Sequence, residues 1–259
     1  MKSLMFVPGK PKMLGKIDSS DADAYIIDME DSINECDKAQ ALEDVCLFLS
    51  TTPNKIIYIR VAGNHLEEEF NRLLKYDFCG YMLPKFEDAS VYVEYADALK
   101  GKEVIALVET PMGLMNLRET ASNPLVSSIA FGAEDFTSAI GMTNCAETLY
   151  YARSEIVTCG KAFHKPVYDT PSFIIDDVQA LEKEIQIAVD LGFDGKLAIH
   201  PKQISLINEL FLSFDLTHLK MIVEQYETAG EAVLRIGDKI YEKMHIAHFK
   251  RILREHGIN

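Results

Sequence analysis

The sequence predicts an α/β protein built on a closed (β/α)₈ barrel, the TIM-barrel fold, with a C-terminal helical extension. Two observations support this fold class: eight short apolar runs recur along the chain, and segments of helical periodicity separate them. Short runs that are apolar on both faces are typical of parallel strands covered on both sides. Eight strand–helix repeats fit one closed barrel, although the same alternation also permits an open doubly wound sheet.

The expected strands are short, and each lies between turn residues or helical stretches. Residues 66–75 illustrate a crossover helix between two of them. After Pro201 the pattern becomes helical, because apolar side chains recur at Ile204, Ile207 and Phe211. The eight expected strands are residues 4–7, 25–27, 56–59, 81–83, 104–108, 128–131, 166–168 and 197–199.

One barrel domain and one C-terminal segment account for the whole sequence. No Gly/Ser-rich linker, repeat array or low-complexity run interrupts the strand–helix pattern. We expect the barrel to occupy residues 1–211. We expect residues 212–259 to form a helical segment that packs on a neighbouring subunit.

Composition narrows the functional classes. The 259 residues carry a formal net charge of −14 at pH 7, which argues against a nucleic-acid surface because phosphate binding needs clustered Lys and Arg. No apolar stretch approaches the roughly 18 residues that a membrane span needs, and the sequence starts without a signal-peptide pattern. We therefore expect a cytoplasmic protein with no membrane or nucleic-acid partner. Five cysteines without Cys/His ligand spacing argue against a disulfide scaffold or a zinc site.

The candidate reactive residues are the polar ones that follow each apolar run, because active sites of (β/α)₈ barrels lie beyond the C-terminal ends of the strands. These residues are mostly acidic. They are Asp28, Glu30 and Asp31 after the second run, Arg60 after the third, Lys85 after the fourth, Glu109 after the fifth, Glu134 and Asp135 after the sixth, and His200 after the eighth.

Carboxylates that converge at a barrel mouth repel one another unless a cation lies between them. A hard divalent cation such as Mg²⁺ meets this need, because it takes oxygen ligands and retains waters or a chelating substrate. Glu109 and Asp135 are the favoured ligand pair. For a lone carboxylate in a loop, a solvated or ion-paired role is the more common alternative.

Arg60 has two readings. It ends an apolar run, where a buried guanidinium needs a carboxylate partner. That partner is either internal, namely Asp28 or Glu30, or it belongs to the substrate. A single histidine before proline, such as His200, is more often a hydrogen-bonded strand terminus than a catalytic group.

Several motifs in order resemble the citrate lyase β-subunit family, which includes citryl-, malyl- and citramalyl-CoA lyases, within the HpcH/HpaI aldolase superfamily. Among them are Pro-Gly after the first strand, Asp-Met-Glu-Asp after the second and Glu-Thr-Pro-Met-Gly after the fifth. The resemblance covers most of the chain. The motifs occupy residues 4–9, 27–31, 59–61, 83–85, 109–113, 131–135 and 192–203.

The resemblance implies a Mg²⁺-dependent retro-Claisen or aldol-type lyase. A 3-hydroxy-acyl thioester, carried on CoA or an acyl carrier protein, would be cleaved into a 2-keto acid and an acyl thioester. Glu109 and Asp135 would bind Mg²⁺, and Arg60 would hold the keto-acid carboxylate and polarise the reacting carbonyl. The remaining implied residues are Lys85, Gly132, Ala133 and Glu134 for substrate binding, with Asp28, Glu30 and Asp31 supporting the site.

The chain departs from the family pattern in the part that would handle the thioester. Glu242 stands where an aspartate usually acts as the catalytic acid, often reaching in from a neighbouring subunit. Ala62 replaces a usual asparagine, and Lys2 replaces a common arginine. The resemblance also implies a homo-oligomer, a trimer or hexamer. Two alternatives remain: a metal-dependent aldolase that acts on a free keto acid without CoA, and a non-catalytic subunit of a larger complex that binds metal and keto acid.

Overall fold

The computed structural model describes residues 1–51, 54–212, 216–255 and 257–258. The chain divides into two compact units, Met1–Phe211 and Leu212–Asn259. Among the described residues, no helix combines the length and the apolar character that crossing a membrane requires.

The first unit is a closed barrel of eight parallel strands, so the predicted fold class is confirmed. Each strand pairs with the next along the chain, and β1 also pairs with β8, which closes the sheet and rules out the open-sheet alternative. The strands are β1 (Ser3–Pro8), β2 (Ala24–Asp28), β3 (Ile57–Arg60), β4 (Gly80–Leu83), β5 (Glu103–Val108), β6 (Ser128–Phe131), β7 (Val167–Asp169) and β8 (Gly195–Ala198).

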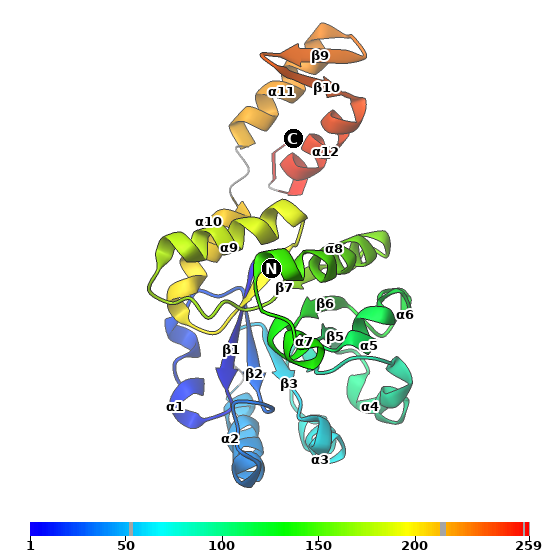
Figure 1. Ribbon diagram of the computed structural model, residues 1–259. Helices are drawn as coiled ribbons and strands as arrows, with labels where there is room; N and C mark the ends of the chain where they lie inside the picture. The colour runs from blue at the N-terminus through cyan, green and yellow to red at the C-terminus, as the bar shows by residue number, and fades with distance from the viewer. Residues whose placement is uncertain (52–53, 213–215, 256, 259) are drawn as a thin grey trace. The chain divides into compact units, whose positions relative to one another are not determined.

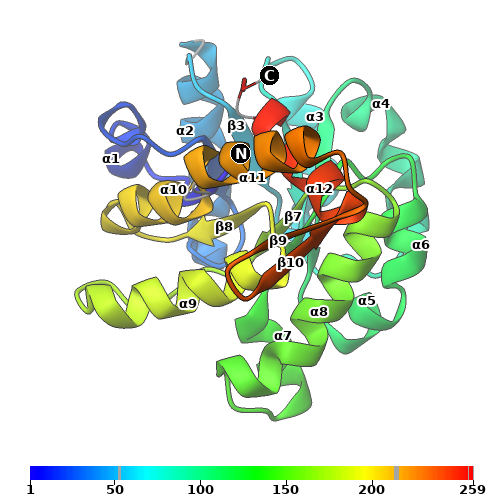
Figure 2. The same ribbon diagram turned by 90° about the horizontal axis from the view of Figure 1, so that it is seen from above.

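Helices surround these strands (Figures 1 and 2). The helices of the barrel unit are α1 (Pro11–Leu14), α2 (Lys38–Ser50), α3 (Leu66–Leu73), α4 (Ala96–Leu99), α5 (Pro111–Met115), α6 (Leu117–Ser122), α7 (Ala133–Ile140), α8 (Ala146–Ala162), α9 (Val178–Leu191) and α10 (Ile204–Leu212). Short 3₁₀ turns also occur, at η1 (Ile17–Ser19), η2 (Glu35–Asp37), η3 (Gly63–His65), η4 (Ala89–Tyr95) and η5 (Pro201–Gln203).

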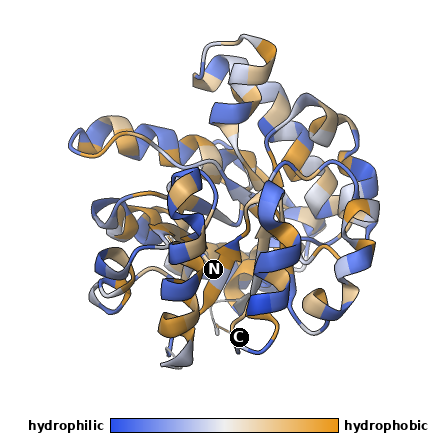
Figure 3. Cartoon of the chain, turned by 90° about the horizontal axis from the view of Figure 1, so that it is seen from below, coloured by the Kyte–Doolittle hydropathy of each residue, from blue (hydrophilic) through white to orange (hydrophobic). Residues whose placement is uncertain are grey.

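The helices mix hydrophilic and hydrophobic residues along their length (Figure 3). Their apolar side chains pack on the outward-facing side chains of the strands. Ile27, Ile59, Val104, Val108 and Phe131 belong to this larger core, which lies between barrel and helices. Because side chains alternate along a strand, the intervening residues must face the barrel axis.

A second, smaller core fills the interior of the barrel. It contains inward-facing side chains from all eight strands, and Phe6 of β1 packs against it. Such layers are why a barrel of this size is a packed core and not a pore. The members of the cluster are Leu4, Ala24, Ile26, Tyr58, Met82, Ile105, Leu107, Ala130, Tyr168 and Leu197.

The second unit consists of α11 (Leu216–Ala229), β9 (Val233–Ile236), β10 (Lys239–Glu242) and α12 (Lys243–Glu255). Besides its two helices, this unit contains an antiparallel hairpin of β9 and β10, which the sequence pattern did not indicate. Gly237, with φ of 60°, opens its two-residue turn, a position that favours glycine. Ile222, Val223 and Tyr241 are buried in the small core of this unit.

Candidate active site

The barrel mouth carries a ring of side chains one step beyond the interior core. Two positions after an inward-facing residue, the next side chain again faces the axis. This rule leads from Ile26 to Asp28, from Tyr58 to Arg60, and from Leu107 to Glu109. On β1, β6, β7 and β8 the same step gives Pro8, Gly132, Thr170 and Ile199. All seven residues line one pocket.

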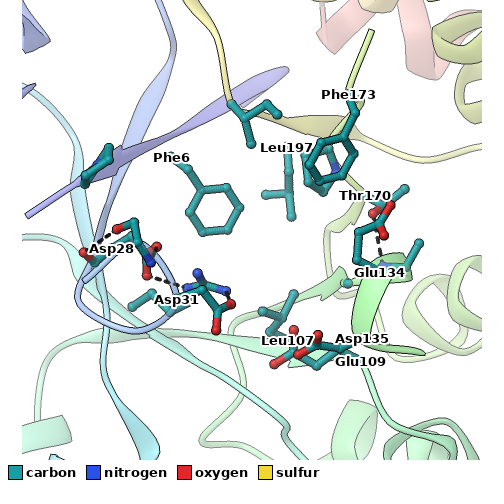
Figure 4. A pocket seen from close by; sticks show the side chains of 17 residues that line it. Phe6, Asp28, Asp31, Leu107, Glu109, Glu134, Asp135, Thr170, Phe173 and Leu197 are labelled. Atoms are coloured by element: carbon teal, nitrogen blue, oxygen red, sulfur yellow. Dashed lines mark hydrogen bonds and ion pairs between the residues drawn. The ribbon is translucent and has the colours of Figure 1, made fainter. Parts of the chain in front are cut away.

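That pocket encloses about 330 Å³ at the mouth of the barrel (Figure 4). Loop residues that follow the strands complete it. Leu107 and Leu197, which belong to the interior core, line its inner end, so the pocket has an apolar floor. The lining residues are Phe6, Pro8, Asp28, Asp31, Ser32, Arg60, Leu107, Glu109, Gly132, Ala133, Glu134, Asp135, Thr170, Pro171, Phe173, Leu197 and Ile199.

Arg60 is held by three carboxylates. Its Nε donates to Asp28 Oδ1 at 2.7 Å, and its Nη1 lies 3.0 Å from Asp31 Oδ2 and 3.4 Å from Glu30 Oε2. The guanidinium also lies over the Phe6 ring, 4.9 Å from its centroid. The internal pairing foreseen for Arg60 is therefore present, and the same side chain still lines the pocket.

The charges in this cluster reinforce one another. Burial on its own would raise the pKa of Asp28, but the hydrogen bond and charge of Arg60 lower it below its ordinary value. Burial on its own would lower the pKa of Arg60, but the negative charges of Asp28, Glu30 and Asp31 outweigh this effect and raise the pKa above its ordinary value. Asp28 also accepts hydrogen bonds from the backbone amides of Glu30 and Ser32. The loop after β2 is thus fixed around a permanently charged guanidinium.

Glu109 is a buried carboxylate, only 3% exposed. Its Oε1 accepts a hydrogen bond of 2.7 Å from the backbone amide of Lys85. Burial, followed by repulsion from Glu30, raises the pKa of Glu109 to about 8. A nearby cation would stabilise the ionised form of this carboxyl group and would therefore lower its pKa again.

Lys85 has φ of 46°, a left-handed conformation that is uncommon for a residue with a side chain. This conformation accompanies the hydrogen bond from its amide to Glu109. Its Nζ lies 3.1 Å from Glu30 Oε1 and 3.5 Å from Asp135 Oδ2. Lys85 therefore contacts the acidic cluster through both its backbone and its side chain.

The residues present fit a hard divalent cation. Glu109 and Asp135 lie beside each other at one edge of the pocket, with their oxygens toward the cavity (Figure 4). No cluster of three or more His, Cys, Asp or Glu suited to a metal occurs among the described residues. Two carboxylates match the donor set that Mg²⁺ uses when waters or substrate oxygens complete its coordination.

The backbone amides at the start of α7 are only partly accessible to a ligand. The amide of Gly132 donates to Val108 O at 3.0 Å, and that of Ala133 donates to Thr170 Oγ1 at 3.1 Å. By helix geometry, the first-turn amides of Glu134 and Asp135 have no intrahelical acceptor. The Glu134 carboxylate accepts a hydrogen bond from Asn144 Nδ2. Of the residues expected to bind substrate here, Gly132 and Ala133 thus have occupied amides, whereas the amide of Glu134, like that of Asp135, has no partner within the helix.

A buried ionic network supports Thr170 from beneath. Lys196 on β8 is fully buried, and its Nζ donates to Asp169 Oδ2 at 2.8 Å and to Thr170 O at 2.6 Å. Arg153 on α8 donates to the same carboxylate through Nε and Nη2. Burial would raise the pKa of Asp169, but Lys196 and Arg153 lower it. Through Thr170, this network reaches the first amide of the helix that carries Asp135.

Thr170, Phe6 and Phe173 are among the lining residues that sequence reasoning missed. Thr170 follows the seventh strand, so the strand-end rule that found the acids would have found it as well. Phe6 reads as an ordinary core residue of a strand. Phe173 lies three residues beyond Thr170, where no periodic signal marks it.

The remaining predicted residues lie outside the pocket. The backbone amide of Ala62 donates to the buried Glu69 carboxylate at 2.9 Å. Lys2 donates its backbone amide to Asp23, and His200 caps η5 by accepting from the Lys202 amide. Glu242 is an exposed residue at the end of β10 in the second unit.

The fold and the site define a class: a (β/α)₈-barrel protein with a paired-carboxylate, arginine-containing pocket at the C-terminal end of its strands. Residues 2–201 match the HpcH/HpaI aldolase/citrate lyase family. The chain belongs to this family, and the predictions of the family and of an enzyme of the carbon–carbon lyase class are confirmed at that level.

Individual relatives give the comparison more detail. Human mitochondrial citramalyl-CoA lyase is 31% identical over 241 residues, covering 81% of this chain and 70% of the relative. A (3S)-malyl-CoA thioesterase of Cereibacter sphaeroides is 27% identical over 269 residues, covering 97% of this chain and 93% of the relative.

Two solved structures from Mycobacterium tuberculosis are similar. The protein CitE in complex with magnesium, acetoacetate and coenzyme A has a TM-score of 0.84 and 25% identity, covering 99% of this chain and 98% of that one. The citrate lyase β subunit complexed with oxaloacetate and magnesium has a TM-score of 0.71 and 28% identity, covering 81% of this chain and 96% of that one.

Proposed function

We propose that the protein is a Mg²⁺-dependent lyase that cleaves the carbon–carbon bond of a 3-hydroxy-acyl-CoA, such as a malyl, citramalyl or citryl thioester. The products are a 2-keto acid and a shorter acyl-CoA. The observation that carries the proposal is the arrangement of Glu109, Asp135 and Arg60 around one pocket on an apolar floor. The complexes of the solved relatives with magnesium support it, and one of them also holds coenzyme A.

Bound Mg²⁺ would supply positive charge that favours loss of the proton from the substrate's 3-hydroxyl and stabilises the resulting alkoxide, from which cleavage to the keto acid starts. Glu109 and Asp135 would hold the ion. Arg60, kept charged by Asp28, Glu30 and Asp31, would orient the carboxylate of the keto-acid half. Because these partners fix Arg60 before substrate arrives, its position costs little reorganisation during the reaction.

Leu107 and Leu197 at the floor, with Phe6 beside them, exclude water from the inner end of the pocket. A drier site strengthens the interaction of Arg60 with a substrate anion. After the bond breaks, the enolate of the acyl thioester needs a proton. We assign this step to Glu242, and we infer that it reaches the reacting carbon from a neighbouring subunit of a trimer or hexamer.

The test is a product assay. The full chain is incubated with Mg²⁺ and chemically prepared malyl-CoA, citramalyl-CoA and citryl-CoA, and the products are separated by chromatography. We expect a 2-keto acid and acetyl-CoA in equal amounts, and no turnover in the presence of a chelator. Free CoA with an intact hydroxy acid would show thioester hydrolysis without carbon–carbon cleavage, which contradicts the proposal. No reaction with any thioester would contradict it as well.

Glu109→Gln keeps the size of the side chain and removes the charge, so it is the matched test of the metal site. We expect it to weaken Mg²⁺ binding at least about tenfold, measured by calorimetry, because one of two carboxylate ligands is lost. Glu119→Gln changes an exposed carboxylate on α6 in the same way, and it should leave Mg²⁺ affinity unchanged. Equal Mg²⁺ affinity in the Glu109 variant and the wild type would dismiss the ligand assignment.

A further inference from the structure

We propose that the 2-keto acid handled by this site carries a single carboxylate and a small apolar substituent, as glyoxylate and pyruvate do. A dicarboxylic keto acid such as oxaloacetate is disfavoured. This inference rests on the proposed function and narrows its substrate class. Two properties of the pocket carry it: the balance of its charges and the position of its apolar side chains.

The pocket is strongly acidic. Five carboxylates line it, those of Asp28, Asp31, Glu109, Glu134 and Asp135. Among the described residues that line it, Arg60 is the single cationic side chain. A Mg²⁺ ion held by Glu109 and Asp135 offsets part of this charge and can chelate one carboxylate together with the neighbouring keto oxygen. A second substrate carboxylate would enter a site that still holds excess negative charge.

Arg60 has little capacity to accept a second carboxylate. Its Nε is committed to Asp28 at 2.7 Å, and Nη1 is shared between Asp31 and Glu30 at 3.0 and 3.4 Å. The ring of Phe6 covers its face. One edge of the guanidinium remains for the carboxylate that the proposed reaction requires. An unpaired carboxylate in a partly buried site loses hydration without compensation.

Lys85 does not supply the cation that a second substrate carboxylate would need. Its Nζ lies between Glu30 Oε1 and Asp135 Oδ2, at 3.1 and 3.5 Å, so its charge is already matched by two carboxylates. Its side chain is not part of the pocket lining. If Lys85 turned to a substrate anion, Glu30 would lose its closest ammonium partner. That loss would be unfavourable, because Glu30 is largely buried and burial already raises its pKa.

Four of the larger apolar side chains of the pocket lie on one sector of the barrel, whereas Leu107 lies at the floor on the side of Glu109 and Asp135. Phe6 comes from β1, Leu197 and Ile199 come from the end of β8, and Phe173 follows β7. In Figure 4, Phe6, Leu197 and Phe173 lie across the cavity from Glu109 and Asp135. A keto acid chelated at the acidic side has hydrocarbon opposite it. That surface suits hydrogen or methyl and gives a second carboxylate no hydrogen-bond donor.

Binding of keto acids tests the inference separately from catalysis. Calorimetry on the full chain with Mg²⁺ would compare pyruvate, 2-oxobutyrate and freshly dissolved oxaloacetate at equal ionic strength. We expect pyruvate to bind at least about tenfold more tightly than oxaloacetate. The substituent of 2-oxobutyrate is uncharged and close in length to that of oxaloacetate. We expect 2-oxobutyrate also to bind more tightly than oxaloacetate. Because the two substituents are similar in length, this difference would report the effect of charge and not of size.

Each outcome has one meaning. Oxaloacetate binding as tightly as pyruvate, or more tightly, would overturn the inference and leave the proposed lyase function standing. Mg²⁺-dependent binding of pyruvate without turnover of any thioester would overturn the proposed function, while the selectivity itself remained. Absence of Mg²⁺-dependent binding for every keto acid would overturn both.

Asp31→Asn tests the electrostatic reason. The Asp31 side chain is 61% exposed and lies 3.0 Å from Arg60 Nη1, so the variant should fold while it removes one charge and frees one donor at the pocket. We expect the preference for pyruvate over oxaloacetate to shrink at least about threefold. Asp97→Asn makes the same change at an exposed site on α4 and should leave the preference unchanged. An equal response in both variants, or none in Asp31→Asn, would overturn the charge-based account.

Discussion

Gly132 lies directly against the carboxylate of Glu109: a Cβ atom at Gly132 would stand 2.7 Å from both Cβ and Oε2 of Glu109. The φ of Gly132 is −108°, which other residues adopt freely, so glycine is required here by space and not by backbone conformation. The proposed metal ligand thus has its position because Gly132, the residue that follows β6, has no side chain.

Gly132→Ala is expected to displace the Glu109 carboxylate and to weaken Mg²⁺ binding at least about tenfold. The Glu109 side chain must move, because contacts this short do not persist between real atoms. Calorimetric titration with Mg²⁺ checks the loss. Gly15→Ala is the control, since its Cβ would meet Pro11 O at an ordinary 3.4 Å, and it should bind Mg²⁺ like the wild type. If Gly132→Ala also binds Mg²⁺ normally, Glu109 does not hold the ion in the geometry described.

Glu69 predicts a pH dependence of stability. It is 2% exposed, and burial raises the pKa of its carboxyl from 4.5 to about 8. Below pH 4.5 the group is protonated in both the folded and the unfolded chain, so its ionisation does not affect the free energy of unfolding. As the pH rises toward 8, only the unfolded chain ionises, so the free energy of unfolding falls. Above pH 8 the folded state ionises too, and the cost levels off.

Glu69→Gln removes this ionisation and leaves an oxygen that can accept from the Ala62 amide. We expect the variant to gain stability relative to the wild type as the pH rises from 5 to 8, on the order of a few kcal/mol at pH 8. Urea unfolding at several pH values measures the difference. A difference that is constant with pH would show that Glu69 does not titrate in this range.

The strands were predictable because the barrel needs strands that are apolar on both faces, and such runs stand out in a sequence. Asp28, Arg60 and Glu109 were predictable as mouth residues for the same reason, since each directly follows such a run. The role of Gly132 beside Glu109 was not predictable, because it depends on how closely the ends of two strands approach each other in the folded chain. The left-handed backbone of Lys85 was hidden too, since lysine carries no signal for that conformation.

The hairpin of the second unit shows a different limit. Its strands are only four residues long, too short for alternation to stand out from the charged helical pattern around them. The turn at Gly237 was the available signal. Phe173 was missed because no reactive group marks it. Thr170, whose hydroxyl accepts from the first amide of α7, was within reach of the strand-end rule but was not named.

Asp169→Asn is expected to destabilise the barrel by about 3–5 kcal/mol, because it leaves Arg153 buried without its carboxylate partner and Lys196 with Glu184 alone, 2.9 Å away. Chemical denaturation gives the value. Asp176→Asn breaks an exposed ion pair with Lys202 and should change stability little, since solvent screens such pairs. A small effect of Asp169→Asn would mean that the network relaxes or that water enters it.

Glu242→Gln tests the acid assigned to the second unit. If Glu242 protonates the enolate, the variant should lose turnover by at least about a hundredfold, in line with the usual contribution of a general acid. The affinity for Mg²⁺ and keto acid should stay within about twofold, because in the proposed site these ligands bind to Glu109, Asp135 and Arg60 and not to Glu242. Glu242→Asp restores the acid with one methylene fewer and should recover part of the rate. Normal turnover in Glu242→Gln would exclude this residue and leave the proton donor to be sought elsewhere, among the carboxylates that line the barrel mouth.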